Sequence, residues 1–341
     1  MANNNHLNFV TGGTGFLGSY LLRYLVQQGK KVRALKRNSS PMQLVEGIAD
    51  KVEWVEGDIL DVPFLEDAMK GVTYVYHVAA MVSYAPKDVD AMMKININGT
   101  ANIVNAALFE GIEKMVHVSS ISALGRIENQ PNVSEKSSWQ ESKTTTNYSI
   151  SKFNSECEVW RGIEEGLTAV MVNPSVILGS GFWDTGSCNL FKKVWDGFKY
   201  YPPGATGFVD VRDVVKTMVA LMESDIQSER FIINSANLTW QEFFNKIGKQ
   251  LGKKPPSILA TALLRELAWR GEWFRSKITG IRPIVTRETA RMASHTFIYD
   301  NTKIKEALNY EFLPIEKTVA ETCTQLKATL PQGTKFAVLP I

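Results

Sequence analysis

Tyr148 and Lys152 are a pair of residues whose types and spacing suggest acid–base chemistry. They are four positions apart in a segment that predicts a helix, so their side chains share one face and can reach the same ligand. A phenol has an ordinary pKa of about 10, and lowering it by ~3 units for work at neutral pH takes about 4 kcal/mol. One ammonium group at ~4 Å, in an effective dielectric of ~20, supplies energy of that order. Lys152 can therefore be the cation that makes Tyr148 a useful acid or base.

The alternative for this pair is an ordinary contact on the surface of a helix, because Tyr-x-x-x-Lys is a short pattern. Ser119 and Ser120 favour the chemical interpretation. They close a predicted strand at 114–119 and supply hydroxyl groups at the edge of the sheet where ligands bind in open parallel sheets.

A glycine cluster at residues 12–18 predicts a phosphate site. It follows an apolar run at 7–10, long enough for one buried strand, and precedes an apolar helical pattern at 20–26. Gly12 permits a tight turn, Gly15 lets the backbone approach a pyrophosphate, and Gly18 lets the helix pack close to the strand. A glycine-rich turn without function is the alternative, but the flanking strand and helix favour dinucleotide binding.

The end of the second predicted strand bears on which dinucleotide binds. An Asp or Glu about 20 residues past the glycines holds the ribose 2′-hydroxyl of NAD, whereas an Arg accommodates a 2′-phosphate. The first acidic residue of the chain is Glu46, and Lys36 and Arg37 stand at the strand end. A solvated basic strand end is the alternative, but the missing carboxylate favours NADP(H), with NAD(H) possible. Asp58, closing the third strand, is placed to bind the adenine amino group or to cap the next helix.

Short apolar strands alternate with helical patterns through the first half of the chain. The predicted strands after the first are 31–35, 52–55, 73–78, 114–119 and 167–172, and the helices between them are 61–70, 88–110 and 148–165. This alternation predicts an α/β fold, a Rossmann-type doubly wound parallel sheet with helices on both faces. Ligands bind such a sheet at the carboxyl ends of the strands, where each motif above falls.

The regular alternation stops after residue 178, which suggests two domains. We predict that 1–178 form the NADP(H)-binding domain and that 207–237 return to it. Residues 179–341 then form a smaller, mainly helical substrate lobe, built chiefly from 179–206 and 238–331. The apolar tail at 336–341 gives no prediction.

Composition excludes several classes of function. The net charge of +3 is too small to indicate nucleic acid or an acidic membrane surface as a partner. No apolar run approaches the ~18 residues of a membrane span, and the first residues do not resemble a signal peptide. Three widely spaced cysteines suit free, buried thiols in a reducing compartment, so a cytoplasmic location is expected.

The remaining polar residues are interpreted as structural. His77 and His117 lie inside predicted strands, and no His, Cys and carboxylate cluster has the spacing of a metal site, so no metal is expected. Asp210, Arg212 and Asp213 could form a site, but an ion-pair network linking the lobes is the favoured interpretation.

As a set, the motifs resemble the extended short-chain dehydrogenase/reductase family, which includes NAD(P)-dependent epimerases and dehydratases of nucleotide sugars. The segments that carry this resemblance are Thr11–Gly18, Gly57-Asp58, His77–Ala80, Asn96–Thr100, Ser119-Ser120, Tyr148-x-x-x-Lys152 and Asn173-Pro174. Further stretches resemble its dihydroflavonol-reductase and 3β-hydroxysteroid-dehydrogenase-like branch; these are 32–37, 172–179, 208–213 and 299–310.

The resemblance implies a role for each matching residue. Tyr148 becomes the general acid/base, Lys152 its partner and a ribose ligand, and Ser120 the hydroxyl that binds the reacting oxygen, with Ser122 as the fallback. The implied cofactor contacts are Gly12, Gly15, Phe16, Leu17, Gly18, Lys36, Arg37, Asp58, Ile59, Ala79, Ala80, Asn96, Tyr148, Lys152 and Pro174. Candidates for the substrate wall, which core packing would equally explain, are Met81, Tyr84, Ser122 and Trp183.

Three functions follow in order of preference. The first is an NADPH-dependent carbonyl reductase, or the reverse alcohol dehydrogenase, acting on a small molecule. The second is a nucleotide-sugar epimerase or dehydratase that retains its cofactor; Asn173-Pro174 in place of Arg-Pro, and Leu178 in place of Tyr, weaken it. The third is a non-catalytic NADP(H)-sensing protein, which the presence of both Tyr148 and Lys152 disfavours. The long helices at 88–110 and 148–165 resemble those of a four-helix dimer interface, so a homodimer is expected.

Overall fold

Seven parallel strands form the central sheet of the computed structural model, which describes residues 6–126, 130–142, 144–280 and 285–341. The strands are β1 (Leu7–Thr11), β2 (Lys31–Lys36), β3 (Glu53–Glu56), β4 (Tyr74–His77), β5 (Lys114–Val118), β7 (Ala169–Pro174) and β11 (Glu229–Ile233). Their order in the sheet is β11-β7-β5-β4-β1-β2-β3, so the direction of winding reverses between β1 and β4. This is the predicted doubly wound fold, with a crevice for a ligand at that reversal.

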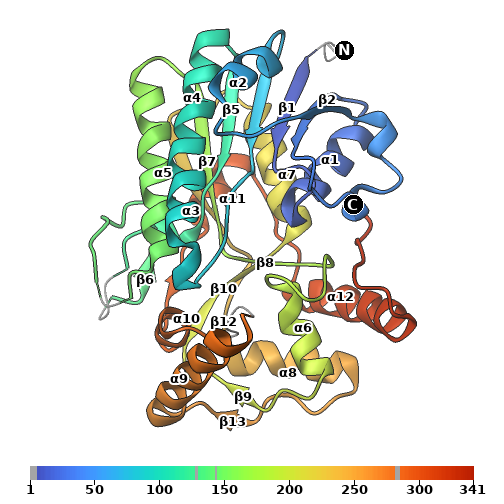
Figure 1. Ribbon diagram of the computed structural model, residues 1–341, viewed down its shortest axis with the longest axis vertical. Helices are drawn as coiled ribbons and strands as arrows, with labels where there is room; N and C mark the ends of the chain where they lie inside the picture. The colour runs from blue at the N-terminus through green and yellow to red at the C-terminus, as the bar shows by residue number, and fades with distance from the viewer. Residues whose placement is uncertain (1–5, 127–129, 143, 281–284) are drawn as a thin grey trace.

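Two layers of helices cover the sheet because its central strands are buried on both faces, β5 along its whole length. Helices α1 (Phe16–Gln27) and α7 (Val211–Met222) pack together on one face. On the other face lie α2 (Val62–Met69), α4 (Gly99–Glu110) and α5 (Asn147–Glu164). Figure 1 shows the pair α4 and α5 on one side of the sheet and the pair α1 and α7 on the other. Each layer encloses its own apolar core.

The helix predicted at 88–110 is present but divided. It consists of α3 (Val89–Met93), a π-helical turn at Lys94–Asn98, and α4. Asn96 in the π-turn is 1% exposed, and its side-chain amide accepts from Met81 N at 2.7 Å and donates to Met81 O at 3.0 Å. The wider turn lets Asn96 hold the loop that follows β4.

A second, smaller sheet lies in the other lobe and has the order β12-β10-β8. Its strands are β8 (Val176–Leu178), β10 (Ala205–Asp210) and β12 (Ala236–Thr239). The expectation that the whole of 207–237 returns to the main sheet is therefore wrong for β10, whereas α7 and β11 do return. β10 pairs in parallel with β8, the short strand that begins two residues after the end of β7.

Helices α6 (Cys188–Trp195), α8 (Trp240–Leu251) and α12 (Ile315–Thr329) pack on this small sheet around Phe191, Phe208 and Phe243. The remaining elements are α9 (Ala262–Thr279), α10 (Arg287–Met292), α11 (Thr302–Leu308) and the paired short strands β6 (Asn132–Val133) with β14 (Ile298–Tyr299) and β9 (Tyr200–Tyr201) with β13 (Ile258–Leu259). No helix of the described ranges has the length and apolarity needed to cross a membrane.

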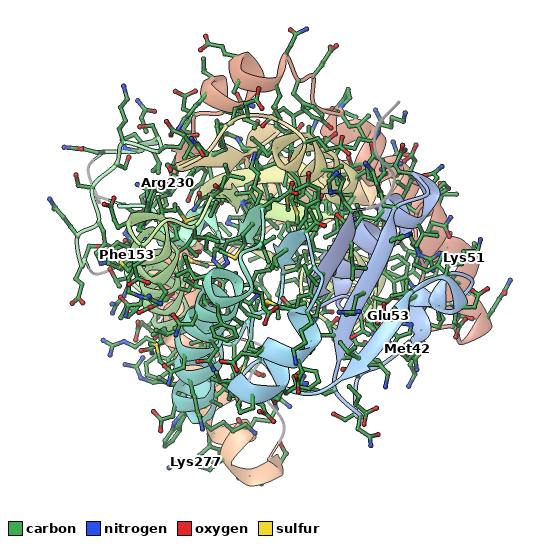
Figure 2. All side chains as sticks on the ribbon, turned by 90° about the horizontal axis from the view of Figure 1, so that it is seen from above. Met42, Lys51, Glu53, Phe153, Arg230 and Lys277 are labelled. Carbon is green, nitrogen blue, oxygen red and sulfur yellow. The ribbon has the colours of Figure 1, made fainter. Side chains whose placement is uncertain are left out.

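The predicted network at Asp210, Arg212 and Asp213 does link the two lobes. The Asp210 carboxylate pairs with Arg212 at 2.7 Å and accepts from Thr318 Oγ1 at 2.8 Å, and Arg212 also pairs with Glu321 of α12. The cysteines differ from expectation in one respect: all three are free, but Cys157 is exposed. Figure 2, a view from above, shows Arg230 of β11 and Glu53 of β3 at opposite edges of the main sheet.

Candidate active site

The glycine turn between β1 and α1 has the geometry of a dinucleotide phosphate site. Gly12 has φ +71°, and a Cβ placed on it would lie 2.7 Å from the Ala79 nitrogen, so only glycine fits where the β1 and β4 loops meet. A Cβ on Gly18 would lie 2.1 Å from Gly12 O. Gly15 caps α1 without any side-chain hydrogen bond, which leaves the first amides of the helix, from Phe16 and Leu17 onward, available to an anion.

The loop after β4 is held against this turn by a buried hydrogen-bond chain. Thr11 Oγ1 accepts from Val78 N at 3.2 Å and Ala79 N at 3.1 Å, and it bonds His77 Nδ1 at 2.8 Å. His77 Nε2 bonds Thr100 Oγ1 at 3.0 Å. Burial, together with Lys152, lowers the pKa of His77 to about 3. The ring is therefore neutral and structural, and it positions Ala79 and the neighbouring Ala80 beside the glycine turn.

The residues expected to contact the adenosine lie at the ends of β2 and β3. Lys36 pairs with Glu56 at 2.8 Å, whereas the Arg37 side chain is exposed and has no ion pair among the described residues. The carboxylate of Asp58 accepts from Leu60 N at 2.9 Å, and it is Asp61 that caps α2. Ile59 is buried against Gly99 of α4.

Tyr148, Lys152 and Ser120 meet at the carboxyl end of β5. Helix α5 starts with a capping box at Thr146, which fixes Tyr148 in the first turn. Burial raises the pKa of Tyr148, while the neighbouring Ser120 and the positive charge of Arg126 act in the opposite direction. Ser120 Oγ also accepts from Ser122 N at 3.1 Å, so its hydroxyl is fixed beside the phenol.

Lys152 lies one turn further along α5, 1% exposed, and its Nζ donates to Val118 O at 2.7 Å. Burial lowers its pKa to about 8, against a partial raising by Glu156. The sequence predicts that Lys152 lowers the pKa of Tyr148. The causes that shift the pKa of this phenol in the structure are burial, Ser120 and Arg126, and Lys152 is not one of them. That action therefore stays a prediction for the cofactor-bound state.

Glu156 and Arg230 complete this region and were not predicted. The buried Glu156 carboxylate pairs with Arg230 at 3.0 Å and accepts from Asn173 Nδ2, which also donates to Ser120 O at 3.0 Å. Asn173, just before Pro174 at the end of β7, thus ties the backbone of Ser120 to α5. The signal that could have revealed Glu156 is its spacing, since Tyr148, Lys152 and Glu156 are each four residues apart on one helix face.

The predicted substrate wall is brought together in part. The Tyr84 ring packs edge-on against Tyr148, with ring centroids 5.8 Å apart, and Met81 lies on the loop held by Asn96. Ser122 lines a narrow cleft with Arg126 and Trp139. Trp183 differs from expectation: it is fully buried in the core of the small lobe, where its ring nitrogen donates to Thr329 Oγ1, so we interpret it as a packing residue.

His117 is buried beside Lys152 and His77, and burial lowers its pKa. Its Nδ1 has no hydrogen-bond partner in the described part of the chain, and Nε2 is 3.4 Å from Ser155 Oγ. Within the described residues, no group of three or more His, Cys, Asp and Glu side chains could hold a metal ion.

The fold and the site together define an α/β protein of the dinucleotide-binding type, with a phenol and an ammonium at the carboxyl end of β5. Residues 8–234 match a family model, that of the NAD dependent epimerase/dehydratase family. The chain belongs to this family. The family's members bind a nicotinamide dinucleotide and are enzymes, and this chain is an NAD(P)-dependent, oxidoreductase-like member.

Curated relatives cover most of the chain. It is 32% identical to "Sterol demethylase protein B" of Methylococcus capsulatus over 73% of this chain and 76% of the relative. It is 29% identical to a putative dihydroflavonol 4-reductase of Synechocystis over 92% of both chains. Identity to cinnamoyl-CoA reductase 1 of Petunia hybrida is 25% over 96% of this chain and 94% of that one.

Solved structures share the fold over nearly the whole length. The crystal structure of gox2253 superposes with a TM-score of 0.81 at 30% identity, covering 95% of this chain and 98% of that one. The dTDP-glucose 4,6-dehydratase DesIV of Streptomyces venezuelae, with NAD bound, gives a TM-score of 0.78 at 19% identity, covering 96% and 98%. The latter likeness concerns the fold alone.

Proposed function

We propose that this protein is an NADP(H)-dependent carbonyl reductase in which Tyr148 is the general acid/base. The observation that carries the proposal is the position of the Tyr148 phenol beside Ser120, which lowers the pKa of the phenol, at the carboxyl end of β5, the strand next to β4 at the β1–β4 reversal. The relatives named as reductases of dihydroflavonol and cinnamoyl-CoA support reduction over epimerisation.

In this proposal the bound nicotinamide supplies the hydride, and the chain supplies position and a proton. Ser120 holds the substrate oxygen, and Tyr148 donates its proton to that oxygen as negative charge develops there. Burial keeps the Tyr148 phenol protonated at neutral pH, the form that reduction needs. Lys152 holds the ribose and stabilises the phenolate that remains.

The preference for NADP(H) rests on Arg37. Its exposed guanidinium at the end of β2 has no ion pair within the described ranges, whereas Glu56 neutralises Lys36. A guanidinium fork suits the 2′-phosphate oxygens, and the position where an NAD-binding carboxylate would stand holds no acid.

The first test is the consumption of NADPH with a panel of carbonyl compounds and nucleotide sugars. Net oxidation of NADPH supports a reductase, whereas turnover of a nucleotide sugar without net oxidation would replace the proposal by the epimerase or dehydratase. Tyr148→Phe should lower kcat by at least ~10²-fold, because the proton donor is lost, while the Kd for NADPH stays within threefold. Retained turnover in this variant would discard the role of Tyr148.

Two neighbouring serines give a matched comparison. Ser120→Ala removes the hydroxyl that lies beside Tyr148 and should lower kcat by roughly 10²-fold. Ser119→Ala is the control, because the buried Ser119 hydroxyl has no partner among the described residues, and its kcat should stay within twofold. An equal fall in kcat in both variants would mean that catalysis depends on the integrity of the end of β5 and not on the Ser120 hydroxyl.

A homodimer through the faces of α4 and α5 is also proposed. Phe109, near the end of α4, is 73% exposed, which suits a residue covered by a partner. Light scattering at micromolar concentration should give twice the chain mass of 38.1 kDa, and Phe109→Glu should give the monomer. A wild-type monomer would contradict the proposal.

A further inference from the structure

Arg126 is a buried cation that the catalytic proposal does not use. It is 8% exposed, and its guanidinium donates from Nη2 to Ser122 Oγ at 3.1 Å. Its face lies 5.5 Å from the ring centroid of Phe297 and 5.9 Å from that of Tyr299. No carboxylate of the described residues pairs with it, and its Nε has no hydrogen-bond partner there.

Such a charge is unusual, because removing an ion from water costs several kcal/mol unless an opposite charge offsets the loss. The chain offsets this cost at buried Arg212 and half-buried Arg230. Arg212 pairs with both Asp210 and Glu321, and Arg230 pairs with Glu156. Among the described residues, Arg126 has only hydroxyl groups and aromatic faces, which partly stabilise a cation and leave N–H groups for a further acceptor.

The location of Arg126 ties it to the catalytic group. Its charge lowers the pKa of Tyr148, Tyr84 and Tyr299 against the raising effect of burial, so the guanidinium lies in electrostatic reach of three phenols that surround the reacting position. It also lines a narrow cleft with Ser122 and Trp139. Ser122, which accepts from Arg126, donates its backbone amide to Ser120 Oγ, so one residue separates the guanidinium from the hydroxyl beside Tyr148.

We infer that Arg126 binds a carboxylate carried by the carbonyl substrate, so that the substrate is an oxo acid or an aldehyde acid. The inference rests on the proposed function and names its substrate class. A guanidinium fork matches the two oxygens of a carboxylate in charge and in geometry. Among the described residues that line the cleft, Arg126 is the single charged one, and the others are hydroxyl, amide or apolar. One positive charge suits a monoanion, whereas a nucleotide diphosphate would need several.

The test compares two aldehydes of the same shape that differ by one charge, 4-formylbenzoate and 4-formylbenzamide, with NADPH and the full chain. The wild type should prefer the acid. Arg126→Gln should lower kcat/KM for 4-formylbenzoate by roughly 100-fold, mainly through KM, and change it less than threefold for the amide. Arg126→Lys, which keeps the charge without the fork, should fall between. Arg270→Gln, which removes an exposed arginine paired with Glu266, is the matched control and should behave as the wild type.

Two outcomes would overturn the inference. One is a wild type that does not prefer the acid. The other is a fall in kcat/KM in Arg126→Gln that is equal for both aldehydes and comes with a shifted pH profile. Arg126 would then act on the acidity of Tyr148 and not on the substrate.

A binding measurement separates this inference from the proposed function. Benzoate and benzamide are titrated into the wild type and Arg126→Gln, and the quenching of tryptophan fluorescence is followed, because Trp139 lines the cleft. If neither aldehyde is reduced, the reductase proposal fails, but benzoate binding that Arg126→Gln weakens at least tenfold still supports the anion site. Equal binding of the acid and the amide overturns it. A thermal melt by circular dichroism verifies that Arg126→Gln is folded, and Arg126→Lys carries the test if it is not.

Discussion

The ammonium of Lys152 is 1% exposed, and its electrostatics differ from those expected from the sequence alone. The spacing of four residues correctly predicts that Tyr148 and Lys152 share one helix face. It does not show that Nζ donates to Val118 O, or that Ser120 and Arg126 are the groups that counter the raised pKa of the phenol. Those contacts join segments far apart in the chain, and no local pattern encodes them.

Burial of Lys152 predicts how stability depends on pH. Its pKa of about 8 in the folded chain lies below its ordinary value of 10.5, so the unfolded chain binds this proton more tightly. Between these two values the unfolded state holds more protons, and the free energy of unfolding therefore rises with pH, by up to about 3 kcal/mol from this one group.

Urea denaturation of the cofactor-free chain from pH 7.5 to 10.5 measures the effect against Lys152→Met, which lacks the titrating group. The difference in unfolding free energy, wild type minus variant, should increase through this range. Lys317→Met, at an exposed position, is the control and should follow the wild type. A difference between the wild type and Lys152→Met that does not vary with pH would show that the ammonium keeps its ordinary pKa.

The two serines illustrate how far residue types alone can lead. The family resemblance implies Ser120 and keeps Ser122 as a fallback. The structure separates them: Ser120 lies beside Tyr148 and lowers its pKa, whereas Ser122 accepts from Arg126. Arg126 itself has no sequence signal, since a single arginine after a buried segment is ordinary, and its importance comes from the absence of a carboxylate partner among the described residues.

At the scale of elements, the strands of the main sheet were predictable because each is a short apolar run that ends in a turn. The helix at 88–110 keeps its apolar pattern through the π-turn. The interruption at Asn96 could therefore not be predicted from the sequence. The small sheet was missed for another reason. β8 has three residues, and β12 follows β11 after a gap of two, so neither stands out until β10 pairs with both.

The ends of β2 and β3 give a prediction about cofactor choice. Arg37→Gln should raise the Kd for NADPH by roughly ten- to a hundredfold and leave the Kd for NADH nearly unchanged, because a guanidinium–phosphate contact is lost. Lys36→Gln removes the same charge from a side chain that already pairs with Glu56, so its effect should be smaller.

Fluorescence titration of each variant with NADPH, NADH and 2′,5′-ADP measures this difference. 2′,5′-ADP isolates the 2′-phosphate, and its affinity should fall in parallel with that of NADPH. If Arg37→Gln raised the Kd for NADH as much as the Kd for NADPH, the arginine would be stabilising the end of β2 and not binding the 2′-phosphate.

At the scale of the whole molecule, residues 336–341 connect helix α1 with the start of the small lobe at Ser180 and Gly181. Leu339 is 2% exposed in the core beneath α1, and its amide donates to the Tyr20 hydroxyl at 2.8 Å. That hydroxyl in turn donates to Ser180 O at 2.7 Å, and Ala337 N donates to Gly181 O at 3.2 Å. The apolar tail at 336–341 carries no periodicity from which this could be predicted, because Tyr20 and Leu339 are 319 positions apart.

Leu339→Ala should therefore lower the free energy of unfolding by about 2–4 kcal/mol, the cost of a cavity in a packed core. Leu263→Ala removes the same atoms from a side chain that is 72% exposed and should change stability by less than ~0.5 kcal/mol. Urea denaturation of both variants measures the difference. If the first turn of α1 binds the cofactor phosphates as proposed, saturating NADPH should raise the free energy of unfolding of Leu339→Ala and of the wild type alike, because NADPH binds the folded state. Equal unfolding midpoints for the two variants would show that residues 336–341 do not contribute to stability. The contacts of Asp210 and Arg212 would then hold the lobes together without them.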